Sequence, residues 1–315
     1  MPLPSEMLPL HAFLLMVSFV LGTLVGSFCN VCISRWPSGE SVVSPRSRCP
    51  KCRNGIVWYD NIPILSWLLL GAKCRHCGLP ISWQYPLVEA VTGVLFALVY
   101  WRFGMVVATP VYMLLCAGLV IATFQDLADW TIPNEITLPG IPVGLGISLI
   151  GMAFENTGLR VIDPFTSFFG ILLGGGILYL MDRLAVLVLR KPGMGFGDVK
   201  LLAMMGAFIG WQGVLGTLMI GSLLGSIIGV TLILMQRRKG SEPVAAVEDV
   251  PGHDATVRKT IADEDDLTIG NHYLPFGPYL CVGGIVYLFA GPEMLAAYIG
   301  WVQAPMAILL GIVPL

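Results

Sequence analysis

The sequence predicts an all-α polytopic membrane protein, a bundle of about eight transmembrane helices with one small loop module on its cytoplasmic side. The first observation is composition: 56% of the 315 residues are apolar, 12% are charged, and the mean hydropathy is +0.79. An ordinary soluble domain carries roughly 25% charged residues. This number of charges is too small to solvate the surface of a chain of this length. The excess apolar residues are therefore expected to face a lipid bilayer. The same composition disfavours secreted, disordered and fibrous classes, and no nucleic-acid partner is expected.

The second observation is the set of long apolar runs. A spanning helix needs about 20 mostly apolar residues, because the hydrocarbon core is ~30 Å thick. The first run has no basic segment before it and is too long for the apolar part of a signal peptide, so we expect a retained helix. A further stretch at 295–315 is expected either to span the bilayer or to lie at its interface. The eight predicted spans are 11–33, 86–103, 105–125, 136–154, 165–189, 199–210, 213–235 and 277–290.

The third observation is where the basic residues fall. If residue 1 lies outside, the loops at 34–85, 126–135, 190–200 and 236–276 lie inside and hold 15 of the 18 Lys and Arg residues. This asymmetry satisfies the positive-inside rule. The predicted organisation is therefore a first transmembrane helix (11–33), a cytoplasmic loop module (34–85), and a bundle (86–315) that carries a polar cytoplasmic loop at 236–276.

The loop module contains two cysteine pairs, Cys49 with Cys52 and Cys74 with Cys77, and 21 residues lie between the pairs. Two residues between thiols allow one turn to present both sulfurs to a tetrahedral ion, and this spacing is typical of a four-cysteine zinc site. The alternatives are two disulfides or four unliganded thiols, and disulfides fit poorly in a reducing cytoplasm. Four protein ligands would close the zinc site, so the metal is expected to be structural.

Two aspartates stand at the ends of predicted spans: Asp126 closes the third and Asp198 opens the sixth. Acids at membrane depth are costly and mark functional sites, and the topology places both at cytoplasmic helix ends. Two adjacent carboxylates share one proton, so one can activate a water while the other polarises an amide carbonyl; the pattern does not say which does which. A helix cap is the alternative for Asp198, but an acid at a helix C-terminus, as for Asp126, opposes the helix dipole.

Small and rigid residues surround these acids in the sequence. Glycines beside Asp198 allow a substrate backbone to approach closely, whereas the nearby lysine is expected to extend toward lipid headgroups. The Pro-Phe-Gly-Pro segment before the last span is expected either to shape a groove beside the acids or to be a turn that starts the helix. The predicted supporting residues are Gly195, Gly197, Lys200, Pro275, Phe276, Gly277 and Pro278.

Taken in order, these motifs resemble the type IV prepilin leader peptidases, bifunctional membrane aspartyl proteases of pilus and type II secretion systems. The resemblance covers nearly the whole chain. It is carried by both cysteine pairs and by the segments 26–31, 35–37, 82–89, 124–139, 195–200 and 274–279.

The resemblance implies that Asp126 and Asp198 are the catalytic pair. It further implies that prepilins or pseudopilins are cut after a glycine at the cytoplasmic face of the bacterial inner membrane. The new N-terminal residue would then be methylated from S-adenosylmethionine. Glu40 is our candidate for a cofactor-binding group that aids the methyl step, with a solvated loop acid as the alternative.

Two features depart from the family pattern, and two other functions stay open. The segment 240–270 is long and acidic, and Asn134 stands where many members carry an acid. One alternative is a peptidase without methyl transfer, in which the zinc loop is purely structural. The other is an ion-coupled transporter, which would need matching broken helices in two repeated halves; no such repeat is visible in the sequence.

Overall fold

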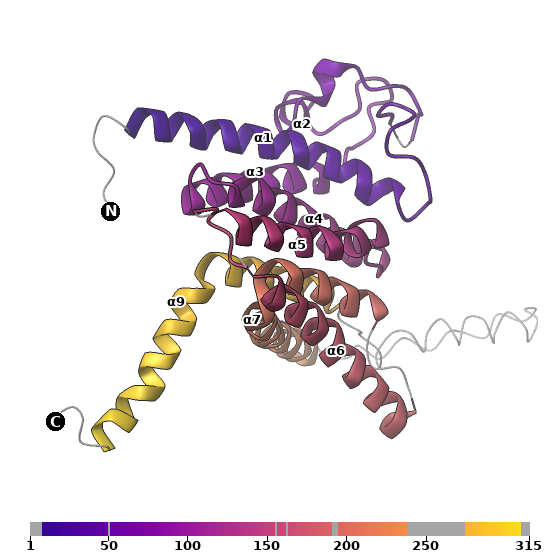
Figure 1. Ribbon diagram of the computed structural model, residues 1–315. Coiled ribbons are helices and arrows are strands. Elements are labelled where there is room, and N and C mark those ends of the chain that lie inside the picture. Colours follow the sequence, from indigo (N-terminus) through magenta and orange to yellow (C-terminus); the bar gives the residue numbers. More distant parts are fainter. Residues whose placement is uncertain are drawn as a thin grey trace, which may run out of the picture.

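The computed structural model describes residues 8–49, 51–154, 156–161, 163–190, 195–238 and 275–309, and within these ranges the chain is helical with no named strand. The all-α prediction is confirmed for this part of the chain. The helices, labelled in Figure 1, are α1 (Leu8–Arg35), η2 (Trp58–Asn61), α2 (Leu65–Leu69), α3 (Gln84–Phe103), α4 (Ala108–Asp129), α5 (Asn134–Ala153), α6 (Pro164–Leu189), α7 (Phe196–Arg238) and α9 (Gly277–Leu309).

Within the described ranges, six helices are long and apolar enough to cross a membrane, and a shorter apolar helix runs over Gly277–Gly291. Large apolar side chains such as Phe13, Leu24 and Leu180 are exposed on the outward faces of these helices. A soluble domain rarely exposes so much apolar surface, whereas lipid-facing helices require it. The six long helices are α1, α3, α4, α5, α6 and α7.

The predicted runs at 199–210 and 213–235 form a single element, α7, which is broken at Gly210. The backbone there has φ 72° and ψ 179°, a conformation that a residue without Cβ adopts at little cost. A Cβ at this position would also lie 2.9 Å from Cγ2 of Thr166 on α6. The two short runs are therefore real helical segments, joined without a loop.

The last helix extends further than the predicted 277–290 span, and it bends (Figure 1). Pro292 has no N–H to bond to the carbonyl of Leu288, four residues earlier. Arg160 supplies that donor from the loop before α6, with Nη2 at 2.8 Å from the Leu288 oxygen. The stretch predicted at 295–315 continues α9 as far as Leu309, and residues 310–315 lie outside the described part of the chain.

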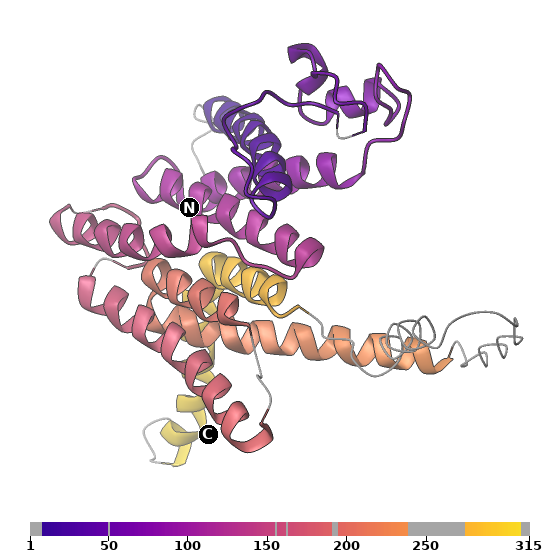
Figure 2. The same ribbon diagram turned by 90° about the vertical axis from the view of Figure 1, so that its right-hand side faces the viewer.

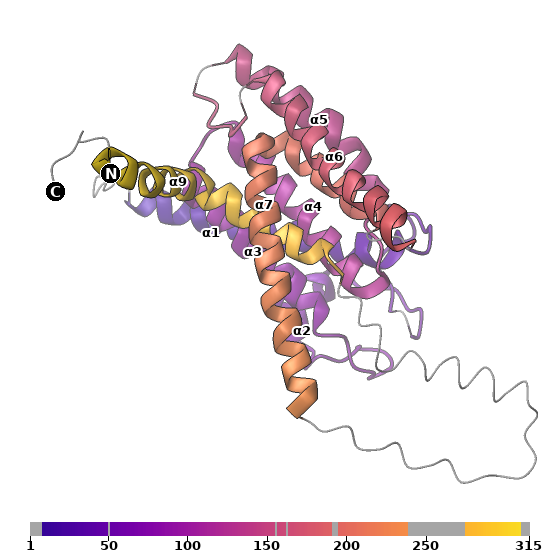
Figure 3. The same cartoon turned by 90° about the horizontal axis from the view of Figure 1, so that it is seen from below.

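Two groups of helices pack on each other through α4. In one group α1, α3 and α4 are mutual neighbours; in the other α7 packs against α5, α6 and α9, and α4 contacts α9 across the boundary. Figure 3 shows α9 crossing α7. At the crossing of α6 and α7, a Cβ on either Gly170 or Gly206 would overlap the carbonyl group of the other residue, so the two backbones touch.

The connection between α1 and α3, residues 36–83, forms a separate unit that we call the cysteine module. It contains η2 and α2 and lies beside the C-terminal end of α1, away from α6 and α7 (Figures 1 and 2). The predicted polar loop at 240–270 lies outside the described residues.

Candidate functional site

Asp126 and Asp198, 72 positions apart in sequence, lie at neighbouring helix ends. Helix α4 ends at Asp129, just after Asp126, and α7 begins at Phe196, just before Asp198. Both residues are buried, with 6% and 8% of their surfaces exposed. The charge of Asp126 acts directly on Asp198, and the thiol of Cys281 on α9 interacts electrostatically with both. The structure thus brings together the two acids that the sequence singled out, at a junction of α4, α7 and α9.

Gly277, the first residue of α9, holds the Asp126 carboxylate. Its backbone N–H donates a hydrogen bond to that carboxylate. A Cβ at Gly277 would lie 2.5 Å from Oδ2 of Asp126, closer than real Cβ contacts allow. A side chain at position 277 would therefore displace this carboxylate from its place at the start of α9.

The Asp198 carboxylate has an oxygen that no group in the described structure satisfies. Oδ1 is buried and has no hydrogen-bond partner among the described residues, so this oxygen does not cap α7. A buried unpaired acceptor costs roughly 1–3 kcal/mol. Oδ1 is therefore available to a water, to a shared proton or to substrate. Gly195 leaves the approach open, because a Cβ there would be 3.9 Å from Oδ2.

Ile132, in the connection between α4 and α5, packs between the starts of α7 and α9. A Cβ at Gly197 or at Gly277 would lie 3.1 Å from side-chain carbons of Ile132. One apolar side chain thus sets the spacing of the two elements that carry Asp198 and Gly277. Sequence reasoning missed this role because an isoleucine in a loop gives no chemical signal.

Lys200 does not extend freely toward headgroups as expected. Its ammonium donates to Oδ1 of Asn134 at the start of α5, and it lies 5.5 Å from the ring centroid of Phe196. The residue therefore ties the first turn of α7 to the first turn of α5. Asn134 serves as the neutral acceptor of this hydrogen bond.

The segment 275–278 forms the start of α9. The Phe276 carbonyl accepts the N–H groups of Tyr279 and Leu280, both at 3.1 Å. Pro278 is buried in the first turn, where proline fits because that N–H has no helical partner. The expectation of a helix-starting turn is therefore met, and Gly277 is the member that contacts Asp126.

The cysteine module consists of two turns that repeat the same backbone pattern. In the first, the N–H of Cys49 donates to the Asn54 carbonyl and the N–H of Arg53 donates to the Cys49 carbonyl, both at 2.9 Å. The turn at Cys74 repeats both bonds at the same lengths. The fourth residue after the first cysteine has positive φ in each turn: 58° at Arg53 and 68° at Gly78.

The two turns bring four thiols together. Their sulfur atoms all lie within 4.8 Å of one another, and the sulfurs of the first and last cysteines are 3.9 Å apart. Zinc–sulfur bonds of ~2.3 Å in a tetrahedron place sulfurs ~3.8 Å apart, whereas a disulfide needs ~2.05 Å. The four cysteines are free thiols, so the disulfide alternative is wrong, and the donor set fits zinc. The cluster is Cys49, Cys52, Cys74 and Cys77.

An ion pair braces the module between its two turns. Nε and Nη2 of Arg75 donate to the two carboxylate oxygens of Asp60 at 2.7 and 2.6 Å. Such bidentate pairs fix geometry as well as charge. The hydrogen bonds from Arg75 lower the pKa of the Asp60 carboxyl, which keeps the pair charged.

Glu89 docks the module on the membrane helices. It is buried in α3, with 8% of its surface exposed, and Oε2 accepts the N–H of Ile64 at 2.8 Å. Ile64 has φ 62°, an unfavourable conformation for a β-branched residue, so the bond holds a strained loop. Helix α1 crosses α3 here, since a Cβ at Gly26 would be 2.7 Å from Cα of Glu89. Sequence reasoning missed Glu89 because its partner is a backbone group in another segment.

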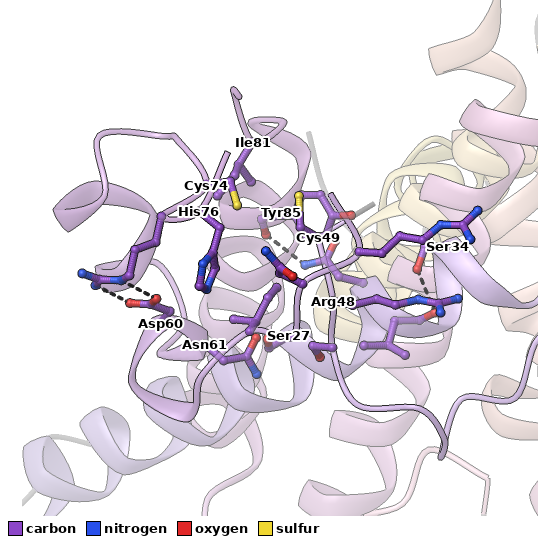
Figure 4. A pocket seen from close by; sticks show the side chains of 18 of the residues that line it. Ser27, Ser34, Arg48, Cys49, Asp60, Asn61, Cys74, His76, Ile81 and Tyr85 are labelled. Atoms are coloured by element: carbon purple, nitrogen blue, oxygen red, sulfur yellow. Dashed lines mark hydrogen bonds and ion pairs between the residues drawn. The ribbon is translucent and has the colours of Figure 1, made fainter. Parts of the chain in front are cut away.

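A cavity of about 400 Å³ lies between the module and the ends of α1 and α3; we call it the module cavity. Polar and charged side chains line much of it, and Figure 4 shows Arg48, Asp60 and His76 around it together with two of the cysteines. Glu40, predicted as a cofactor-binding group, lines the cavity, and its Oε2 is 3.6 Å from Nη2 of Arg48. This hollow has the size and polarity for a charged small molecule.

Two family models match the chain. Residues 20–103 match the bacterial peptidase A24 N-terminal domain, and residues 113–230 match the type IV leader peptidase family. The first match contains the cysteine module and Glu89, and the second contains Asp126 and Asp198.

Curated relatives are similar over almost the full length. A prepilin leader peptidase/N-methyltransferase of Myxococcus xanthus is 34% identical over 99% of this chain and 98% of the relative. Proteins of the same name from Stutzerimonas stutzeri and Pseudomonas aeruginosa are 32% and 30% identical, over 90% of this chain and 92% of each relative. No solved structure matches the chain.

Proposed function

The chain belongs to the type IV leader peptidase family, and from this membership we propose that it removes the leader of prepilins or pseudopilins and then N-methylates the new N-terminus. The observation that carries the peptidase half is the meeting of Asp126 and Asp198 at one buried junction of three helices. A transporter is not favoured, because the family and the relatives are peptidases.

Cleavage uses the two carboxylates as a unit. One of them, ionised, removes a proton from a water while the other, protonated, donates to the peptide carbonyl. A bond forms between the water oxygen and the carbonyl carbon; the C–N bond then breaks as a proton passes to the departing amine. The N–H of Gly277 orients Asp126, and the unpartnered Oδ1 of Asp198 is open to water or substrate.

The proposed location suits a substrate that stays in the membrane. Asp126 and Asp198 lie at helix ends that face the cytoplasm in the predicted topology of an inner-membrane protein. In the resembled family the leader is short and basic, and an apolar helix follows it. Acids at the membrane's inner edge attract a basic leader within a Debye length of ~8 Å, while the apolar helix remains in lipid.

Zinc is the proposed structural metal of the cysteine module. Cys49, Cys52, Cys74 and Cys77 would supply all four ligands, which leaves no open position for catalysis. Their role would be to hold the two turns together and to fix the floor of the module cavity, which Cys49 and Cys74 line.

The module cavity is the proposed binding site for S-adenosylmethionine. When bound, this donor supplies a methyl group on a cationic sulfur, and transfer to a neutral amine leaves a thioether and releases one proton. Glu40 and Asp60 present carboxylates to the cavity, which suit the charged groups of such a donor. Asp60 is fixed by Arg75, so Glu40 is the freer of the two.

The test is the mass of the product. Purified protein in lipid nanodiscs is incubated with a full-length prepilin and isotopically labelled S-adenosylmethionine, and the mature chain is weighed. We expect loss of the leader and gain of one labelled methyl group. Loss of the leader without the label would leave the peptidase-only alternative, and an uncut substrate would contradict the proposal.

A further inference from the structure

A second, smaller hollow of about 250 Å³ lies between the ends of α1 and α4; we call it the end groove. Ser34 of α1 and Tyr85 of α3 line one side, and Ala128 and Asp129 of α4 line the other. Asn30, Ser34 and Tyr85 also line the module cavity. The two hollows are therefore separated by one shared wall of three residues.

This wall has a fixed base and an exposed edge. Asn30 is buried, with 5% of its surface exposed, and its Nδ2 donates to the Tyr85 carbonyl at 3.0 Å. This bond holds the end of α1 against the start of α3. Ser34, one turn further along α1, is exposed, and its hydroxyl donates to the Val31 carbonyl of its own helix. Figure 4 shows Ser34 and Tyr85 at the module cavity together with Cys49. Ser34 is therefore the small, exposed part of the wall between the two hollows.

Helix α4 connects the end groove to the acid pair. Asp126 and Asp129 are three residues apart, so they lie within one turn and near the same face of the helix. Asp126 is turned to Gly277 of α9, and Asp129 lines the end groove. The groove therefore begins one helical turn from the proposed site of cleavage.

The charge of the groove matches the product of cleavage. Cutting the leader creates an α-amine, whose pKa of ~7.7–8.0 leaves it mostly cationic at neutral pH. The exposed Asp129 carboxylate has no hydrogen bond or ion pair among the described residues. It can therefore pair with a cationic amine without first losing a protein partner.

We propose that the end groove receives the freed N-terminus of the cleaved substrate and guides it past Ser34 into the module cavity. This inference rests on the proposed function, since it joins the two reactions by one path. The amine exists only after the C–N bond is cut, so methyl transfer follows cleavage, and the groove makes this order a short movement along α4. The binding partner is a cationic chain end, followed by apolar residues.

The test fills the groove and leaves the acid pair and the four cysteines in place. Ser34→Trp places an indole at the shared wall, and Leu24→Trp is the matched control, because it places the same indole on an outward face of the same helix, away from both hollows. The readout is the ratio of unmethylated to methylated product among substrate molecules already cleaved. We expect Ser34→Trp to raise this ratio at least tenfold and Leu24→Trp to match the wild type. Asp129→Asn, which lies outside the module cavity, is expected to raise it in the same direction, and Asp129→Glu to restore it.

Equilibrium dialysis with labelled S-adenosylmethionine separates the groove from the donor site. Ser34→Trp protein that binds the donor as the wild type does, yet leaves cleaved product unmethylated, supports the path. A wild-type ratio in both Ser34→Trp and Asp129→Asn would overturn it, and so would lost donor binding in Ser34→Trp with a wild-type ratio in Asp129→Asn. Wild-type protein that adds no methyl group to any substrate would instead contradict the proposed function.

Discussion

The membrane bundle and the cysteine module are held in shape by different kinds of interaction. In the bundle, buried side chains from many helices fix the acid pair, and one apolar residue, Ile132, spaces the starts of α7 and α9. In the module, two short turns repeat one backbone pattern around four thiols, with little buried apolar surface of their own. The comparison teaches that the two proposed reactions depend on separable supports, joined at Glu89 and along the end groove.

The largest expected effect is the loss of leader cleavage when either acid of the pair is replaced. Asp126→Asn and Asp198→Asn keep the shape of the side chain, but an amide cannot share a proton with the remaining carboxylate. Each variant should therefore slow leader cleavage at least ~100-fold. Methylation should fall equally, because no new amine forms. The measurement is the cleavage rate of a prepilin in nanodiscs, and zinc content should stay at the wild-type level. Zinc loss in either variant would show that bundle and module are not separable.

Cysteine replacement should break the module and spare the bundle. Cys74→Ser removes one of four thiolates, and metal binding of this kind is coupled to folding of the site. We expect loss of bound zinc by metal analysis and loss of methyl transfer, with cleavage retained. Cys116→Ser, in the buried core of α4, is the matched control, expected to keep zinc. Full methylation by zinc-free Cys74→Ser protein would contradict the structural role of the metal.

Glu89 tests the joint between the two regions. Glu89→Ala leaves the N–H of Ile64 without its acceptor, at a cost of about 1–3 kcal/mol in docking of the module. Glu89→Gln keeps an acceptor oxygen and should lose less. Hydrogen exchange over residues 58–70 should rise in the alanine variant, together with a lower methylated fraction. Unchanged exchange would show that another contact docks the module.

The smallest effects concern the two turns and have opposite signs. A methyl group at Gly78 meets no atom within 4 Å, so Gly78→Ala costs only the backbone strain of positive φ, about 1–2 kcal/mol. Arg53→Gly relieves the same strain in the first turn, with a gain of at most about 1 kcal/mol after the flexibility of glycine is counted. The temperature of zinc release should fall in the first variant and rise in the second. Shifts of the same sign in the two variants would show that positive φ does not have the same effect in the two turns.

The sequence could predict residues whose type is unusual for the segment in which they stand. Acids at the ends of apolar runs identified Asp126 and Asp198, and paired cysteines in a polar loop identified the thiol cluster. The interruption after the run at 199–210 also predicted a break, which the structure places at Gly210.

Residues that act through distant partners were not predictable. Glu89 bonds a backbone group 25 positions away, and Ile132 touches glycines on two other elements. Such contacts depend on which helix ends meet, and one sequence contains no record of that. The same limit applies to Lys200, whose partner Asn134 is near only because α5 and α7 start side by side.

The central claim, that Asp126 and Asp198 form one catalytic unit, is tested most directly by their double variant. Groups that act as a unit have non-additive effects, so removing both should cost no more than removing the more damaging one. Leader cleavage by Asp126→Asn, Asp198→Asn and the double variant is measured with enzyme in excess over prepilin. We expect the double variant to cleave as slowly as the slower single variant. Losses that multiply, or a single variant that cleaves at the wild-type rate, would contradict the claim.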